Sequence, residues 1–94
     1  MLAYKLNKII EDVHDHMGLR LLKIRDKVGY TLVSINKKDN IDTNVEIIVR
    51  RSQRLILIRI NLVKDLEDIA NDLRIIIEKW LREFKRHIVI ELEE

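Results

Sequence analysis

The chain has 94 residues, of which 47% are hydrophobic and 36% are charged, and it contains no cysteine. This composition is typical of one globular domain spanning residues 1–94, and it excludes disulfide frameworks, thiolate zinc sites and cysteine nucleophiles. Lysine and arginine total 18 against 16 acidic residues, so the formal net charge is only +2 and any basic surface must be local.

No apolar run in the sequence approaches the roughly 20 residues that a membrane-spanning helix needs. The first residues lack the basic stretch, long apolar run and cleavage site of a secretion signal. We therefore expect a cytoplasmic protein that does not associate with membranes. The abundance of isoleucine, lysine, arginine and glutamate, together with the absence of proline, resembles the composition of proteins from hot environments.

The first segment of the chain is predicted to be a helix. Apolar residues recur there at helical spacing, at Leu2, Leu6, Ile9, Ile10, Val13 and Met17. Gly18 follows at the position where a residue in the left-handed conformation commonly ends a helix. The alternative interpretation makes residues 3–9 a strand, but apolar and polar residues alternate poorly in that segment.

A hairpin and a loop are predicted next. Residues 19–25 and 30–36 are expected to be paired strands, because Asp26 and Gly29 between them suit a tight connection. Residues 36–43 are rich in asparagine and aspartate, which form local turns and favour no regular element. This segment is therefore predicted to be a loop that separates two hairpins.

The second hairpin has predicted strands at residues 45–50 and 55–62, in which apolar residues recur every second position. One face, directed toward a helix, carries Val45, Ile47, Val49, Ile56, Ile58, Ile60 and Leu62. The opposite face carries Ile48, Leu55 and Leu57 among charged residues. Because a sheet face in contact with water should be polar, these three residues require a cover, either the first helix or a partner chain.

The clearest helical pattern follows the second hairpin. Apolar residues fall on one helical face at Leu66, Ile69, Ala70, Leu73, Ile76, Ile77, Trp80 and Phe84. We expect Asp65 to cap the first turn and the basic residues 85–87 to lie at the negative end of the helix dipole. Ile75 points to the opposite side and is predicted to be exposed. Residues 87–92 form either a last edge strand or a continuation of the helix.

Together these segments predict one α+β domain in the order helix, four strands, helix, with a possible terminal strand. The connections are short, so sequential antiparallel pairing is expected. The predicted fold is a small antiparallel sheet of four to five strands, formed by two hairpins and packed with an N-terminal helix and a long C-terminal helix. At this size a partner subunit commonly supplies additional buried surface.

The sequence contains few residue patterns that are typical of catalytic sites. His14 and His16 are the nearest approach to a metal cluster, but residues two apart on a helix point about 200° away from each other and cannot share an ion unless the helix frays or a partner supplies ligands. No activated nucleophile, glycine-rich phosphate loop or nucleotide fingerprint is present. We therefore expect a noncatalytic protein that uses neither a cofactor nor a metal.

Basic residues gather in the second hairpin and the preceding loop, at Lys37, Lys38, Arg50, Arg51, Arg54 and Arg59. Such a positive strip can contact phosphates even when the net charge is low. Aromatic stacking partners are missing from the hairpin, and Tyr30 is the only aromatic residue expected in the sheet. Contact with the nucleic-acid backbone therefore fits better than base stacking, and a solvated hairpin tip is the alternative.

The segment from Val45 to Phe84 combines two strands and a helix with Ile-Arg-Ile-Asn at 58–61 and Lys-Trp-Leu-Arg at 79–82. With these features it is similar to the C-terminal half of the small dimerising subunit family of the KEOPS complex, which makes the threonylcarbamoyl modification on tRNA adenosine. The resemblance implies a noncatalytic subunit that pairs with a like subunit and docks a kinase-like catalytic protein, with tRNA as the distant substrate. That family opens with a strand and a helix, whereas here a helix comes first and residues 19–36 supply an additional hairpin.

The leading hypothesis is a noncatalytic assembly subunit that forms a homodimer, or a heterodimer with a similar small subunit, within a larger tRNA-modifying complex. It would associate through the face bearing Ile48, Leu55 and Leu57 or through an exposed strand edge. The first alternative is a nucleic-acid-binding module whose basic hairpin contacts RNA or DNA. The second alternative is a small metal-dependent enzyme whose acidic groups come together only across a dimer.

Overall fold

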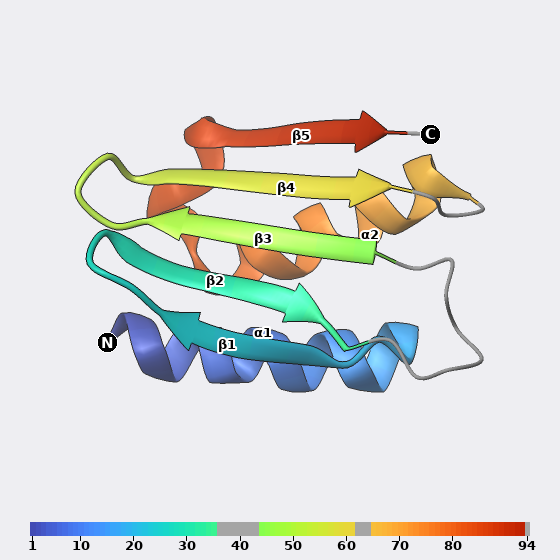
Figure 1. The fold of residues 1–94 in the computed structure, drawn as a ribbon, viewed down its shortest axis with the longest axis horizontal. Helices are drawn as coiled ribbons and strands as arrows, with labels where there is room; N and C mark the ends of the chain where they lie inside the picture. The colour runs from blue at the N-terminus through green and yellow to red at the C-terminus, as the bar shows by residue number, and fades with distance from the viewer. Residues whose placement is uncertain (36–43, 62–64, 94) are drawn as a thin grey trace.

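The computed structural model describes residues 1–35, 44–61 and 65–93 of the chain. Its elements are α1 (Leu2–Met17), β1 (Leu21–Arg25), β2 (Gly29–Ser34), β3 (Asn44–Arg50), β4 (Leu55–Asn61), α2 (Leu66–Trp80), the 3-10 helix η1 (Arg82–His87) and β5 (Ile88–Glu93). The strands form one sheet in the order β1-β2-β3-β4-β5 (Figure 1). The predicted α+β class and both predicted hairpins are confirmed. No helix within the described ranges combines the length and hydrophobicity that crossing a bilayer requires.

Helix α1 forms because one of its faces is apolar and becomes buried. Leu6, Ile9 and Val13 are fully buried, and α1 packs against both β1 and α2. Gly18 has φ 67° and ψ 15°, and its N–H donates to the carbonyl oxygen four residues earlier at 2.9 Å. This left-handed residue ends the helix as predicted. The alternative interpretation of the segment as a strand is therefore wrong.

The turn between β1 and β2 is held by one aspartate side chain. Oδ1 of Asp26 accepts the backbone N–H groups of Val28 and Gly29, each at 2.8 Å. Such local bonds are the reason that aspartate favours turns. Gly29 is also required sterically, because a Cβ atom at this position would overlap the carbonyl oxygen of Val49 in β3.

Strand β3 is the central strand of the sheet, since it pairs antiparallel with β2 on one side and with β4 on the other. In the turn between β3 and β4, Arg54 has φ 51° and its N–H donates to the carbonyl oxygen of Arg51 at 3.3 Å. The predicted loop at 36–43 and the predicted last strand residue, Leu62, lie outside the described residues.

The second helix is shorter than the long C-terminal helix that the sequence predicted. Helix α2 ends at Trp80, because Leu81 has φ −122° and ψ 62°, and the chain continues as η1. Leu81 is fully buried and Phe84 is 5% exposed, so the change of direction keeps both side chains in the core. A continuous α-helix would advance about 1.5 Å per residue along its axis. Here the chain instead turns back within η1 and starts β5 beside β4 (Figure 1).

The start of α2 also differs from the prediction. Asp65 has left-handed backbone angles, φ 60° and ψ 44°, and its side chain makes no capping hydrogen bond. A capping residue normally has extended backbone angles, which direct its side-chain oxygen toward the free N–H groups of the first turn. Asp65 contributes its backbone carbonyl instead, which accepts the N–H of Ile69 at 3.1 Å. Glu67 and Asp68 lie in the first turn, where the helix dipole favours negative charge.

The last segment forms strand β5, so the helix-continuation alternative is wrong. Strand β5 runs parallel to β4, and the connection between them passes through α2 and η1, as parallel neighbours require. Ile88 and Ile90 pack against the core, whereas Leu92 is 41% exposed. The sheet is therefore antiparallel except at this edge.

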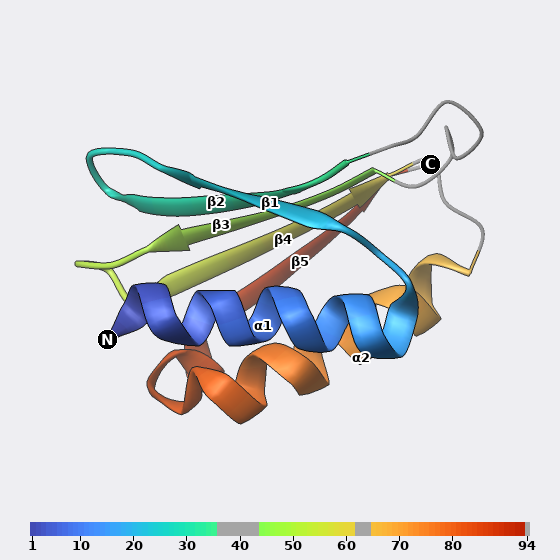
Figure 2. The same ribbon diagram turned by 90° about the horizontal axis from the view of Figure 1, so that it is seen from below.

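Both helices pack on the same face of the sheet (Figure 2). The strand residues predicted to face a helix are at most 1% exposed, namely Val45, Ile47, Val49, Ile56, Ile58 and Ile60. Ile75, on the outer side of α2, is 57% exposed as predicted. Because α1 lies beside α2, it does not cover the opposite face of the sheet, and that alternative is wrong. We call this opposite face, which no described helix or strand covers, the helix-free face.

Candidate interaction surface

A largely apolar row of residues crosses the helix-free face from one edge of the sheet to the other. Cross-strand pairing aligns one residue from each of the five strands, namely Ile24, Thr31, Ile48, Leu57 and Val89. We call these five residues the apolar row. Ile24 is 47% exposed and Val89 is 48% exposed, while the three central members are partly buried by their neighbours in the sheet. Four of the five positions therefore present aliphatic side chains on a face that water reaches.

A second row runs beside the apolar row, two residues away along each strand. Pairing aligns Leu22, Val33, Glu46, Arg59 and Glu91, which we call the charged row. Nη1 of Arg59 lies 3.0 Å from Oε1 of Glu46, and Nη2 lies 3.6 Å from Oε1 of Glu91. These side chains are between 36% and 45% exposed, so the pairs contribute modestly to stability. One arginine between two carboxylates leaves the charged row with an excess negative charge.

All three predicted interface residues lie on the helix-free face. Ile48 and Leu57 belong to the apolar row, and Leu55 lies opposite Arg50 on the other side of that row. The exposed members Ile24 and Val89 were not among the residues predicted for this face. The alternation of apolar residues within β1 and β5 carried that signal, but only the strand order aligns these residues with β3 and β4.

The structure gathers three of the six predicted phosphate-binding residues, Arg50, Arg51 and Arg54, at one end of the sheet. The two hairpin turns lie side by side there (Figure 1), and the N–H of Arg51 donates to the carbonyl oxygen of Val28 at 3.1 Å. This basic end comprises Arg25, Lys27, Arg50, Arg51 and Arg54. Three of its members, Arg25, Lys27 and Arg51, line one pocket between the turns.

Two of the basic residues join this end although the sequence analysis did not single them out. Arg25 and Lys27 come from the first hairpin, and only the pairing of β2 with β3 brings them beside the second. Arg59 lies apart from the basic end, in the charged row, where two carboxylates pair with it. Lys37 and Lys38 lie outside the described residues.

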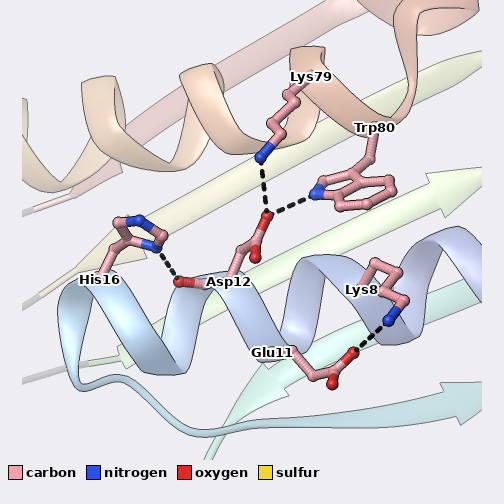
Figure 3. A network of polar contacts seen from close by, with 6 residues as sticks. All are labelled: Lys8, Glu11, Asp12, His16, Lys79 and Trp80. Carbon is pink, nitrogen blue, oxygen red and sulfur yellow. Dashed lines mark hydrogen bonds and ion pairs between the residues drawn. The ribbon is translucent and has the colours of Figure 1, made fainter.

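A polar cluster joins α1 to α2 in the helix layer, on the side of the sheet opposite the helix-free face (Figure 3). Nε1–H of Trp80 donates to Oδ2 of Asp12 at 2.6 Å, and Nζ of Lys79 lies 3.7 Å from the same oxygen. The hydrogen bond from Trp80 and the positive charges of Lys79 and His16 lower the pKa of Asp12, against the opposing effect of desolvation. The cluster ties the two helices together.

His14 and His16 do not form a metal site with the described residues around them. Nδ1 of His16 is hydrogen-bonded to the backbone carbonyl of Asp12 at 2.9 Å, and Nδ1 of His14 lies 3.8 Å from Oδ1 of Asp15. No group of three or more metal-binding side chains gathers anywhere in residues 1–35, 44–61 and 65–93. The alternative of a metal-dependent enzyme therefore gains no support from the part of the chain that the structure describes.

Compared with known protein families, curated proteins and solved structures, the chain shows no match. The similarity to the KEOPS subunit family therefore stays a prediction, which rests on the residues of β4 and α2 that carry it. The function has to be inferred from the surface of the chain itself.

Proposed function

We propose that this protein is a noncatalytic assembly subunit that associates through its helix-free face, with another copy of itself or with a similar small subunit. The observation that carries the proposal is the apolar row, which reaches both edges of the sheet while no described element covers it. A sheet face that stays in contact with water is expected to carry polar side chains, including at the positions between its charged residues. Exposed apolar patches of this kind are typical of protein interaction sites.

Burial of the apolar row stabilises the association by a moderate free energy. Moving a fully exposed aliphatic side chain out of water stabilises by roughly 1.5–3 kcal/mol. Ile24 and Val89 begin about half exposed, and Ile48 and Leu57 begin less exposed than that. Each therefore contributes less than the full value, and the row as a whole favours reversible association more than an obligate complex.

Light scattering of the purified chain tests the proposal. We expect the wild-type mass to exceed that of one chain at micromolar concentration. Leu57→Lys should return it to one chain, because the substitution places a charge within the apolar row. Ile75→Lys is the matched control, since Ile75 is also exposed but lies on α2 away from this face. A wild-type mass equal to one chain, or a Leu57→Lys variant that associates like wild type, contradicts the proposal.

The larger setting proposed for this subunit is a tRNA-modifying complex. Its support is the resemblance of residues 45–84 to the dimerising KEOPS subunits, which implies docking to a kinase-like catalytic protein. Affinity capture of the tagged chain from its native cell tests this setting. We expect a kinase-like protein among the captured partners. Capture of only further copies of the chain would contradict the tRNA-modifying setting and leave self-association intact.

A second candidate function is contact with the backbone of RNA or DNA at the basic end. The observation that favours it is the convergence of the two hairpin turns, which places three cationic side chains around one pocket. Replacing Arg25, Lys27, Arg51 and Arg54 with alanine should weaken binding and reduce its salt dependence. Arg59→Ala is the control, because that arginine is paired with two carboxylates elsewhere. Equal affinity of both variants, or no binding by the wild-type chain, would exclude this function.

A further inference from the structure

Two opposite charges flank the centre of the helix-free face. Strand β3 is the central strand, and its residue Ile48 occupies the middle of the apolar row. Glu46 lies two residues before Ile48 and Arg50 two residues after it, so all three side chains point to the same face. At about 3.3 Å per residue, each charge is roughly 7 Å from Ile48 along the strand. The face therefore carries a negative and a positive charge at equal distances from its apolar centre.

A surface that associates with a copy of itself through a two-fold axis places the same patch on both sides. For two sheets packed face to face with aligned strands, that axis lies between the sheets and runs close to either β3 or the apolar row. An axis along β3 would place Glu46 opposite Glu46 and Arg50 opposite Arg50. An axis along the apolar row places Glu46 of each copy opposite Arg50 of the other. Like charges oppose association, so the charge pattern selects the second arrangement.

We infer that the partner of the helix-free face is a second copy of this chain, packed so that the two β3 strands run antiparallel and Glu46 of each copy pairs with Arg50 of the other. The inference rests on the proposed function and names the partner for it. In this arrangement Ile48 lies on the symmetry axis against Ile48 of the second copy. Residues of the apolar row then meet the corresponding row, at the distance of about 10 Å that separates packed sheets.

Charges farther from the axis agree with the same arrangement. The basic end lies on the Arg50 side of the apolar row, and the charged row, with its excess negative charge, lies on the Glu46 side. Rotation about the apolar row brings the basic end of each copy toward the charged row of the other. The long-range charge distribution therefore favours the orientation that the central pair selects.

The size of the face is sufficient for a weak dimer. The five strands have 5, 6, 7, 7 and 6 residues, so at about 3.3 Å per residue and about 4.8 Å between strands they outline roughly 490 Å² of projected area on each copy. Two such faces give roughly 980 Å², close to the ~1,000 Å² that separates specific interfaces from weak or transient ones. Pairing through the β1 or β5 edge would leave this area in water, which is the reason that we favour the face.

Charge reversal with mixing tests the inference on the full-length chain. Glu46→Arg alone and Arg50→Glu alone should each weaken self-association by roughly tenfold or more, since each places like charges opposite one another. An equimolar mixture of the two variants should associate about as tightly as wild type, because both ion pairs form again in the mixed dimer. The double variant should also associate like wild type. Sedimentation velocity measures all four cases, and circular dichroism verifies that each variant is folded.

The mixing step separates the interface from effects within one chain. Glu46→Arg places a second arginine beside Arg59 and disturbs the charged row, but mixing with another variant cannot repair an intramolecular clash. Recovery in the mixture therefore requires contact between positions 46 and 50 of different copies. Glu46→Arg mixed with wild type is the control, and only partial recovery is expected there, because one of the two contacts is restored and the other stays repulsive.

Two results would overturn the inference. If Glu46→Arg associates with wild type more tightly than wild type does with itself, the axis runs along β3. If the reversal variants associate like wild type while Leu57→Lys does not, the face is used with a different geometry or through another part of the face. In both cases the proposed function stands. A wild-type chain that stays monomeric overturns the inference and the proposed function together.

Discussion

At the scale of single residues, the contact between Asp12 and Trp80 has the clearest physical consequence. The carboxylate of Asp12 accepts a hydrogen bond from the indole and lies near the ammonium group of Lys79. Both interactions favour the ionised carboxylate, so the pKa of Asp12 falls below the ordinary value of about 3.9. A carboxyl group with a lowered pKa in the folded state stabilises the fold at every pH above its unfolded value, and this stability is lost as the pH falls through the folded pKa.

Asp12→Asn should therefore lower the thermal unfolding temperature at pH 7, because asparagine keeps a neutral acceptor for the indole but loses the charge. The difference from wild type should shrink as the pH falls below about 4, where the Asp12 carboxyl group of the unfolded chain becomes protonated, and it should be lost once the pH is below the lowered pKa of the folded state. Thermal unfolding followed by circular dichroism between pH 7 and pH 3 measures this. Glu11→Gln is the control, since Glu11 is exposed and pairs only with Lys8 in the described contacts. A difference of equal size at both ends of the range would contradict the assigned role of the charge.

At the scale of elements, local signals predicted most of the fold. The apolar stripe of α1 with Gly18 after it, and the turn around Asp26, depend on neighbours in sequence and were confirmed. The end of α2 was not predictable, because Leu81 and Phe84 can be buried by either an α-helix or a 3-10 helix. The parallel pairing of β5 depends on where the chain returns after α2, which no local pattern specifies.

Local patterns also predicted part of the candidate interaction surface, whereas the rest depended on how the strands pair. The alternation in β3 and β4 was sufficient to place Ile48, Leu55 and Leu57 on one face. The pairing of Arg59 with two carboxylates required the register between three strands, so sequence reasoning grouped this arginine with the hairpin turn instead. The sequence also does not determine which face of the sheet α1 covers, because an amphipathic helix can pack on either face of a sheet that is apolar on both.

The buried face of α2 should carry much of the stability. Leu73 is fully buried, and Leu73→Ala should reduce the free energy of unfolding by about 2–5 kcal/mol through lost burial and a residual cavity. Ile75→Ala, on the exposed side of the same helix, should change it by less than about 0.5 kcal/mol. Urea unfolding of the two variants provides the comparison. Equal losses would mean that α2 does not contact the sheet through the face described.

At the scale of the whole molecule, the layer arrangement determines which face of the sheet is buried and which face is available for contact. Two helices on one side of a five-stranded sheet bury one face and leave the other without a described cover (Figure 2). That face is apolar in a row across its centre and carries opposite charges on the two sides of the row. This pattern is the basis of our proposal that the face associates with a rotated copy of itself.

Intermolecular nuclear Overhauser effects test this account most directly, because they report contacts between methyl groups of different chains. A mixed sample of isotope-labelled and unlabelled wild-type chains should show effects between copies at the methyl groups of Ile48 and Leu57, and none at the exposed methyl groups of Ile75. Effects confined to Ile75, to the strand edges or to α1, with none at Ile48 and Leu57, would contradict the claim that the helix-free face is the interface.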